Sequence, residues 1–319
     1  MLSTEIRGTE VVGHVRAMAT DVTMQVCRGD EALDALEDLV AVALRVFRTV
    51  EQACTRFDPQ SPLMRANARP TEAHRLPHVC FEALREAARA YRLTDGRFDP
   101  RVLGDLLELG YDRSLPFADG DLHLDDRSAP RRPPLPEWTP QFRAETKEVV
   151  LGPLPVDLGG IGKGLAVRWA SEVLRLRAPD HLVEGGGDCY CSGRAPGGGP
   201  WLVAVEDPFG GQSPRAVLEL RDQACATSSI RLRNWCVGGR PVHHLVDPDS
   251  GQPGGAGLRA VTVVAPDPAT AEVWAKALFL AGAADIQAAA GDQAALWIDD
   301  TDTVTVTAAM ARLVCWGPQ

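Results

Sequence analysis

The sequence predicts an α+β fold with a mixed or mostly antiparallel sheet and flanking helices. The first observation is that short apolar runs, separated by Gly, Pro and Asp, gather between residues 148 and 265. The second is that one long helical pattern, 160–177, interrupts them, while the other helical patterns lie before and after. Clustered strands with helices set apart are typical of an α+β fold and disfavour a doubly wound parallel sheet.

The N-terminal part of the chain is predicted to hold one strand and two helices. Residues 1–14 show no clear pattern and are predicted to be a tail, so that residues 15–319 form a single domain. Residues 15–27 alternate between apolar and polar side chains, as a half-buried strand does. Apolar residues then recur at helical spacing over 31–53 and 76–93, which predicts two amphipathic helices.

Later elements follow from the same two periodicities. Residues 113–141 are rich in Pro, Asp and Arg with weak periodicity, which predicts a surface excursion or a small subdomain. Strands are predicted at 149–151, 181–184, 188–192, 201–205, 216–220 and 258–265. Helices are predicted at 268–281 and 283–290, a strand at 294–298, and a last strand or helix at 304–314.

The composition limits the function classes. The chain of 319 residues has 33 Lys and Arg against 43 Asp and Glu, a net charge of −10, which disfavours nucleic acid and anionic membranes as partners. It has no run of about 18 apolar residues, so no membrane span is predicted. Residues 1–12 carry Glu5, Arg7 and Glu10 and no apolar run, which does not fit a secretory or lipoprotein signal. A cytoplasmic location is expected.

Cysteine and histidine spacing does not predict a metal site. The eight cysteines are scattered, and we expect them to be reduced core residues. Cys189 and Cys191 would share one strand face, but no further ligand is near in sequence. His74 and His78 have helical i,i+4 spacing, but Pro77 between them breaks that turn.

The segment from Asp157 to Ala166, with sequence DLGGIGKGLA, is the most informative in the chain. An apolar strand, 154–156, is predicted to end on Asp157, and Lys163 begins the next helix. Free N–H groups and the positive end of a helix dipole suit an anion. The glycine spacing matches neither a Walker loop nor the Rossmann pattern, since Gly164 and Leu165 stand where those motifs need other residues. Alone, such a turn is also a common structural connection.

Further motifs occur in a definite order along the chain. They are Met18–Thr20, Phe57–Ser61 with Asn67, Gly96–Pro100, Glu184–Asp188, Ala226–Ser229, His243–Gly251 and Ala271–Leu278. Together with the glycine-rich loop they resemble the ApbE family, the FAD:protein FMN transferases, over roughly residues 15–315. The resemblance implies an ApbE-like, T-fold-like architecture with a small subdomain.

The resemblance implies a transferase reaction with two partners. FAD would be cleaved at its diphosphate, FMN would pass to a Ser or Thr hydroxyl of an acceptor protein, and AMP would leave. Such a reaction needs a base for the hydroxyl and positive charge for the diphosphate, which a divalent cation commonly supplies. The alternative is a catalytically altered FAD-binding protein, either an FAD hydrolase or a flavin-dependent redox protein.

By resemblance, His244 occupies the position of the catalytic base. It precedes Leu-Val-Asp-Pro, an apolar pair and a turn that would hold the ring at a strand end. Neighbouring strand residues face opposite ways, so we expect only one of His243 and His244 to be catalytic. The plain alternative is that the chosen histidine is an ordinary strand residue.

The residues that the resemblance places at FAD-contacting positions come from several motifs. Phe57 stands where relatives often carry Tyr, so it can stack on a ring but lacks the hydroxyl. Asp157 and Lys163 would otherwise be interpreted as a helix cap and an exposed helix lysine. The full set of these positions is Met18, Phe57, Phe98, Asp99, Asp157, Lys163, Gly186, Gly187 and Val246.

The metal position departs from the family pattern. The resemblance places the Mg²⁺ ligands at the Gly160 carbonyl, at Glu272 and at Lys276, where the family has Thr. An ammonium has only donors and is repelled by a cation. Either Lys276 replaces the ion and pairs with Glu272, or the chain binds flavin without transferring it. A surface Glu–Lys pair is the plain third interpretation.

Overall fold

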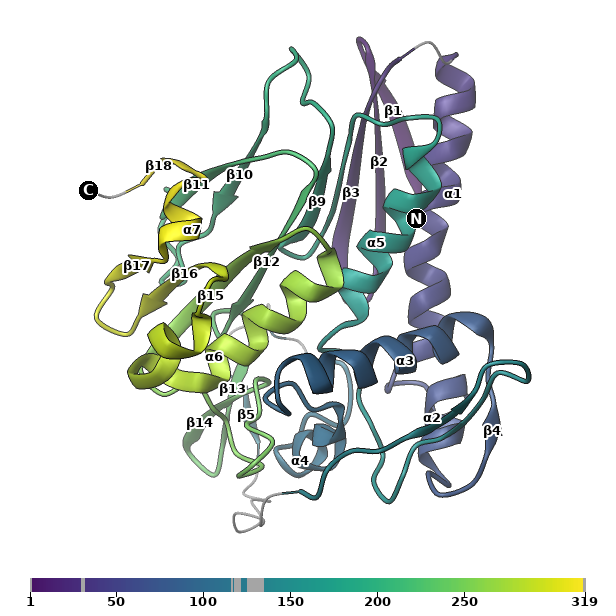
Figure 1. Ribbon diagram of the computed structural model, residues 1–319, viewed down its shortest axis with the longest axis vertical. Helices are drawn as coiled ribbons and strands as arrows, with labels where there is room; N and C mark the ends of the chain where they lie inside the picture. The colour runs from purple at the N-terminus through teal and green to yellow at the C-terminus, as the bar shows by residue number, and fades with distance from the viewer. Residues whose placement is uncertain (1, 30–31, 116, 118–121, 125–134, 318–319) are drawn as a thin grey trace.

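The computed structural model describes residues 2–29, 32–115, 117, 122–124 and 135–317 and confirms the α+β class (Figure 1). Its centre is a nine-stranded sheet in the order β1-β2-β3-β8-β9-β12-β15-β16-β17. Neighbouring strands in this sheet all pair antiparallel. The strands are β1 (Ser3–Arg7), β2 (Glu10–Ala17), β3 (Thr20–Cys27), β8 (His181–Gly185), β9 (Asp188–Ser192), β12 (Gln223–Ser229), β15 (Leu258–Ala265), β16 (Ala294–Asp299) and β17 (Val304–Val306).

The prediction of an N-terminal tail over residues 1–14 was wrong. Residues Ser3–Arg7 form β1 at the sheet edge, and β2 begins at Glu10. Most side chains of β1 are exposed, so no apolar alternation marks it in the sequence. Backbone pairing with β2 forms this strand, and a hydrophobicity pattern does not record backbone pairing.

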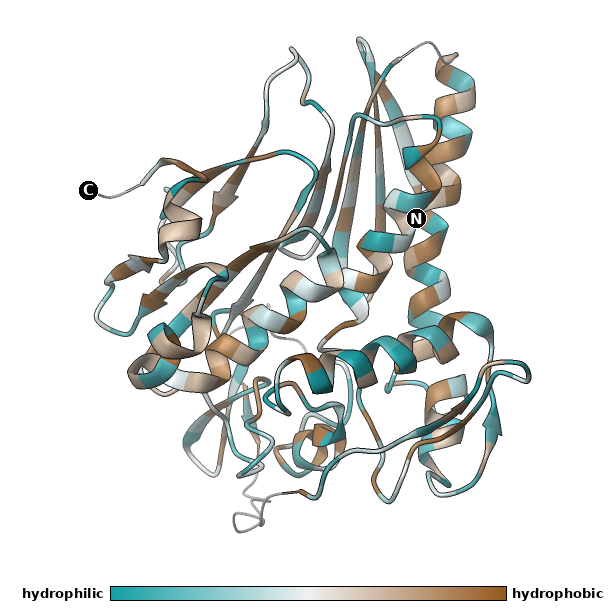
Figure 2. Ribbon diagram, viewed as in Figure 1, coloured by the Kyte–Doolittle hydropathy of each residue, from teal (hydrophilic) through white to brown (hydrophobic). Residues whose placement is uncertain are grey.

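Helices α1 (Leu33–Cys54), α5 (Gly162–Arg175) and α6 (Pro268–Ala290) pack against one face of this sheet. Apolar residues recur along α1 at helical spacing, with polar residues between them, as in a helix that packs one side on a core (Figure 2). The predicted break between 281 and 283 is present, since Gly282 has φ 75° and ψ 165° inside α6. No helix of the described ranges combines the length and hydropathy that spanning a membrane requires.

The other face is covered by a small sheet of β10 (Trp201–Val205), β11 (Ala216–Leu220) and β18 (Val314–Trp316), with α7 (Ala308–Ala311) beside it. The predicted strand or helix at 304–314 is therefore one strand, one helical turn and the start of another strand. All eight cysteines are free, and five of them are buried as expected, whereas Cys27 and Cys236 are half-buried and Cys315 is exposed.

The remaining elements form two small sheets and several short helices below the main sheet (Figure 1). The sequence predicted α3 (His78–Leu93) and β7 (Glu148–Val150) and missed the others. Those are α2 (Pro62–Asn67), β4 (His74–Arg75), the 3-10 helix η1 (Pro100–Val102), α4 (Leu103–Glu108), β5 (His123–Leu124), β6 (Gln141–Arg143), β13 (Asn234–Val237) and β14 (Arg240–His243).

Much of the predicted excursion at 113–141 lies outside the described residues, which omit 116, 118–121 and 125–134. Its described part contacts the rest of the protein at several points, among them β5 and Trp138. Residues 123–124 form β5 and pair in parallel with β13. Trp138 is 3% exposed, and its indole N–H donates to the Leu151 carbonyl at 2.8 Å.

The predicted strand at 154–156 does not form. The side chain of Asn67 takes the place of a neighbouring strand: its amide nitrogen donates to the Val156 carbonyl at 2.8 Å, and its amide oxygen accepts from the Val156 N–H at 2.9 Å. Asp157 then donates its N–H to the Pro100 carbonyl at 2.6 Å. A buried side chain thus positions the entrance to the glycine-rich loop.

The turn between β2 and β3 has two consecutive left-handed residues, Met18 at φ 55° and Ala19 at φ 57°. This is the geometry of a type I′ hairpin turn, which favours Gly. We expect Ala19→Gly to stabilise the protein by about 0.5–1 kcal/mol, because relief of the left-handed strain exceeds the added entropy of the unfolded chain. The free energy of unfolding in urea measures this change. Ala19→Val should do the opposite, and a less stable Ala19→Gly variant would contradict the strain.

Candidate active site

A cavity of about 470 Å³ lies where segments far apart in the sequence converge. Its volume falls in the range of roughly 300–1,000 Å³ that small-molecule sites occupy. The lining comes from the β2–β3 turn, the C-terminal end of α1, the loop before η1, the loop leading into α5, the residues next to β13 and β14, and the middle of α6.

Most residues that the sequence singled out lie in this cavity. Those in its lining are Met18, Phe57, Phe98, Asp99, Asp157, Gly160, Lys163, His244, Val246 and Lys276. Three others, Gly186, Gly187 and Glu272, do not line it. A Cβ on Gly160 would lie 2.9 Å from Phe98 Cε2 and 3.3 Å from Lys276 Cδ, so this glycine lets both side chains approach the loop.

His244 lines the cavity directly after β14, whereas His243 is turned away. The ring of His243 packs edge-on against Phe279, with 5.9 Å between ring centroids. His244 Nδ1 lies 3.2 Å from the Arg233 carbonyl oxygen, which can only accept, so Nδ1 carries the proton of the neutral ring. Burial lowers the pKa of His244 well below 6.5, and the charges of Arg233 and Lys276 lower it further. At neutral pH the ring is therefore uncharged, with its lone pair on Nε2.

Lys163 and Lys276 face one buried carboxylate. The Glu272 side chain is 1% exposed, and its Oε1 lies 3.1 Å from the Nζ of each lysine. Its Oε2 accepts from the Gly164 backbone N–H at 2.7 Å. Lys163 also donates to the buried carboxylate of Asp188. Both oxygens of Glu272 are therefore occupied, and Glu272 and Lys276 form an i,i+4 pair on α6.

The two lysines keep Glu272 ionised. Burial raises the pKa of Glu272, but the charges of Lys163 and Lys276 outweigh burial and bring this pKa to about 2. Burial lowers the pKa of Lys163 to about 8, although the negative charge of Glu272 opposes the change. Lys163 and Glu272 are thus both charged at pH 7, and their contact is an ion pair.

The side chains at this position do not supply the ligands that Mg²⁺ requires. The ion takes oxygen ligands in octahedral geometry. Here each oxygen of Glu272 already accepts a hydrogen bond from an N–H group. The Lys276 ammonium has only hydrogen-bond donors and no lone pair for a metal ion. In the part of the chain that the structure describes, no group of three or more His, Cys, Asp or Glu could hold a metal ion.

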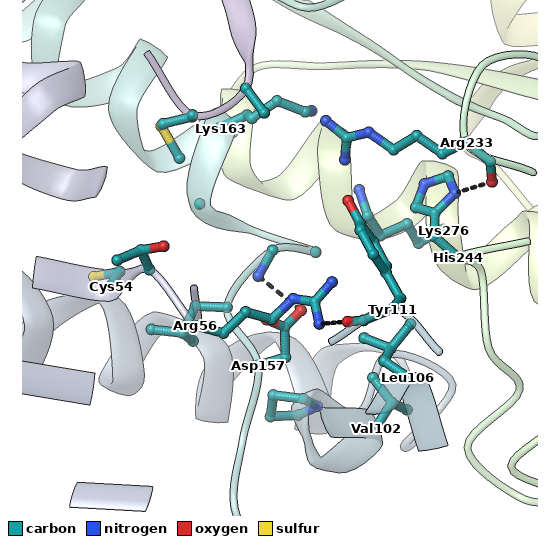
Figure 3. A pocket seen from close by; sticks show the side chains of 18 of the residues that line it. Cys54, Arg56, Val102, Leu106, Tyr111, Asp157, Lys163, Arg233, His244 and Lys276 are labelled. Atoms are coloured by element: carbon teal, nitrogen blue, oxygen red, sulfur yellow. Dashed lines mark hydrogen bonds and ion pairs between the residues drawn. The ribbon is translucent and has the colours of Figure 1, made fainter. Parts of the chain in front are cut away.

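Asp157 is held by a stacked arginine (Figure 3). Its Oδ1 lies 3.5 Å from Arg56 Nε, and its Oδ2 accepts from the Gly159 N–H at 3.1 Å. The Arg56 guanidinium lies 4.4 Å from the Phe57 ring centroid and 4.1 Å from that of Tyr111, which is cation–π geometry. Burial raises the pKa of Asp157, while the Arg56 charge opposes the shift. Phe57 and Tyr111 thus give the cavity an aromatic wall, with their two rings inclined by 55°.

Asp99 lines the cavity, but its carboxylate is occupied elsewhere. Its Oδ1 accepts from Arg101 Nε at 3.0 Å, and its Oδ2 accepts from Arg101 Nη2 at 2.6 Å, both side chains being buried. Its Oδ1 also accepts from the Arg101 backbone N–H at 2.8 Å and so caps η1. We therefore assign the Asp99 carboxylate to holding this loop, which positions Phe98.

Gly186 and Gly187 form the tight turn between β8 and β9. Their φ values of 66° and 89° lie in the left-handed region, and a Cβ on Gly186 would lie 2.5 Å from Thr20 Oγ1. The turn leads directly into Asp188, whose carboxylate accepts a hydrogen bond from the Lys163 ammonium. The glycine triplet thus positions the partner of a cavity lysine and is not part of the cavity wall.

Several residues of the candidate site were not predicted from the sequence. Arg56 and Arg233 line the cavity as further cations, Tyr111 contributes an aromatic ring, and Asp188 anchors Lys163. Asp188 ends the motif Glu184–Asp188, and Arg56 directly precedes the motif Phe57–Ser61, so adjacency to a motif was a signal for these two residues. Tyr111 and Arg233 stand in no motif, and only their place in the fold reveals them.

The chain matches known proteins over most of its length. The model of the ApbE family matches residues 18–297. An FAD:protein FMN transferase of Chlamydia pneumoniae is 29% identical over 250 residues, which cover 73% of this chain and 73% of that protein. One of Chlamydia trachomatis is 29% identical over 259 residues, covering 77% and 76%.

Solved structures share the fold at lower identity. The ApbE protein of Thermotoga maritima superimposes with a TM-score of 0.78 at 23% identity, over 98% of this chain and 99% of that one. The flavin transferase ApbE from Vibrio cholerae superimposes with a TM-score of 0.75 at 22% identity, over 98% and 100%. The architecture is therefore that of these proteins.

Proposed function

This chain belongs to the ApbE family, and we propose that it is a transferase that moves FMN from FAD to a Ser or Thr hydroxyl of an acceptor protein. The observation that carries the proposal is the cavity itself. A neutral histidine with its lone pair on Nε2 lies there beside two lysines and an aromatic wall. The names of the relatives, FAD:protein FMN transferase, agree with that chemistry.

His244 acts as the general base in this proposal. Its Nε2 takes the proton of the acceptor hydroxyl as the hydroxyl oxygen attacks the phosphorus of the FMN half of FAD. The bond between that phosphorus and the bridging oxygen breaks, and AMP leaves with the bridging oxygen and its electron pair. The Arg233 carbonyl keeps Nδ1 protonated and so holds the required tautomer.

Lys163 and Lys276 supply positive charge to the diphosphate. Both extend from helices into one cavity, and their shared carboxylate, Glu272, fixes their positions. Fixed charges aimed at a developing anion stabilise it without reorganisation. We infer that the Lys276 ammonium takes the place that a metal has in the family pattern, because this donor set does not fit Mg²⁺.

The flavin is expected to bind against the aromatic wall. Phe57 is 40% exposed and lines the cavity, so its ring is accessible to a ligand bound there. Phe98 and Met18 line the same cavity and offer further apolar surface. The Asp157 carboxylate lies close to this wall and offers an acceptor for a flavin N–H group.

Incubation with FAD tests the function, with and without a Thr-bearing acceptor protein. Chromatographic separation of FAD, FMN and AMP shows whether the diphosphate is cleaved, and the mass of the acceptor shows whether FMN is attached. A covalent adduct with release of AMP supports the proposal. Bound FAD that stays intact would support the alternative of a flavin-binding protein without transferase activity, and FMN plus AMP without adduct would identify a hydrolase.

A cytoplasmic location stays a prediction.

The metal requirement gives a separate prediction. EDTA is expected to leave FAD cleavage by the wild-type protein nearly unchanged, because Lys276 occupies the ligand position with a fixed positive charge. The double variant Glu272→Asp with Lys276→Thr restores an oxygen pair on one helix face and should make cleavage dependent on Mg²⁺. Rates with and without EDTA measure both effects. Loss of wild-type activity in EDTA would contradict the replacement of the metal by Lys276.

A further inference from the structure

Arg233 is joined twice, through its backbone, to the histidine that the proposed function uses as a base. Its carbonyl oxygen accepts from the His244 backbone N–H at 3.3 Å and lies 3.2 Å from His244 Nδ1. The loop that carries it is fixed by Asn234, whose side-chain amide donates to the Ile230 and Arg231 carbonyls at 2.9 and 2.8 Å. The backbone of Arg233 is therefore held in place whatever its side chain does.

The side chain of Arg233 points into the cavity, on the side where Lys163 and Lys276 end (Figure 3). In the described part of the chain it has no hydrogen bond or ion pair with a protein acceptor. Arg56 has two such partners, Asp157 and the Tyr111 carbonyl. A guanidinium has five N–H donors and strongly prefers carboxylate or phosphate oxygens. Its cavity position without such a partner indicates that an anionic ligand supplies the acceptors.

The charges around Arg233 support the same conclusion. Its guanidinium lies in the same cavity as Lys163 and His244 (Figure 3), and its positive charge lowers the pKa of both groups. Of the nearby carboxylates, Glu272 accepts from Lys163, Lys276 and the Gly164 backbone N–H, and Asp157 pairs with Arg56. An acidic protein, with a net charge of −10, thus gathers uncompensated positive charge at one point. Like charges held together repel one another, and a bound polyanion removes that repulsion.

We propose that the Arg233 guanidinium binds the diphosphate of FAD and stabilises the negative charge that develops on it as AMP leaves. The inference rests on the proposed function and names the residue that, with Lys163 and Lys276, would complete a metal-free phosphate site. Arg233 forms and breaks no covalent bond and transfers no proton. It contributes hydrogen bonds to phosphate oxygens that strengthen when the bridging bond breaks.

The experiment compares Arg233→Ala and Arg233→Lys with Arg231→Ala in the full chain. Arg231 is a matched control two residues away, since its side chain pairs with Glu206 at 3.3 Å. Each variant keeps the backbone carbonyls that hold His244 and Asn234. Fluorescence titrations with FAD and with riboflavin, which has no phosphate, separate diphosphate recognition from ring recognition. Thermal melts identify any variant that has lost its fold.

Arg233→Ala is expected to weaken FAD binding by about 10–100-fold, as loss of charge-assisted hydrogen bonds does, with riboflavin binding unchanged. Its rate of FAD cleavage at saturation should fall by about 10²–10³-fold. Arg233→Lys should recover part of both, and Arg231→Ala should behave as wild type. Equal losses for FAD and riboflavin, or wild-type FAD binding in Arg233→Ala, would overturn the inference. If the wild type never cleaves FAD, the proposed function fails, while the comparison of the two ligands still decides the role of Arg233.

Discussion

Replacing His244 with alanine is expected to lower the rate of FMN transfer by about 10²–10⁴-fold, the usual contribution of a general base. FAD affinity should stay nearly constant, because a base acts in the chemical step and not in ground-state binding. The expectation follows from the position of the ring in the cavity and from its Nδ1 contact with the Arg233 carbonyl. Quenched time courses of acceptor labelling measure the rate of transfer, and titration with FAD measures the affinity.

His243→Ala is the matched control for this prediction. Its ring packs on Phe279 outside the cavity lining, so the substitution should lower stability and leave the rate of transfer intact. The rate of transfer should also be insensitive to mild acid. The pKa of His244 lies well below 6.5, so the ring stays unprotonated, and able to act as a base, at pH 6.5. An active His244→Ala variant and an inactive His243→Ala variant would reverse the assignment.

Glu272→Ala is expected to destabilise the protein by about 3–5 kcal/mol, the typical cost of removing one partner from a buried ion pair. The carboxylate is 1% exposed and holds both Lys163 and Lys276, and its loss also leaves the Gly164 N–H without its acceptor. Glu272→Gln should cost less, because the amide oxygen can still accept from one donor. Chemical denaturation of both variants measures the change in the free energy of unfolding.

Two comparisons test whether loss of the buried ion pair causes the destabilisation. Glu172→Ala, at an exposed position of α5, should change stability by less than about 0.5 kcal/mol. The pKa of Glu272 falls from 4.5 to about 2 on folding, so its stabilisation is complete above pH 4.5 and is lost as the pH falls toward 2. The stability difference between wild type and Glu272→Gln should shrink over that interval. A difference that does not depend on pH would show that packing, and not charge, makes Glu272 important.

The sequence alone predicted the elements whose pattern is local. The helices α1, α3, α5 and α6 and the strands β9, β10, β11 and β15 were found close to their observed bounds. Their periods of 3.6 and 2 residues arise from neighbours in the chain, so the pattern is present before folding. The break in α6 at Gly282 was visible for the same reason.

The motif order likewise singled out several residues of the candidate site in advance. His244, Lys163 and Lys276 were singled out from the sequence, and the fold brings them to one cavity. The i,i+4 relation of Glu272 to Lys276 is a property of any helix, so their contact could be anticipated. The departure from the metal pattern could also be recognised from residue types alone, because an ammonium has no lone pair for an ion.

Only the tertiary structure decided which distant residues complete the site. Arg56 contacts aromatic rings from two segments, Asp188 binds Lys163 from 25 positions along the chain, and Arg233 enters the cavity from a loop without a motif. The structure also put the supposed N-terminal tail into the sheet and replaced a predicted strand with contacts to Asn67. These outcomes depend on how elements pack and pair, and the residues involved are separated in sequence by connections whose path local periodicity does not record.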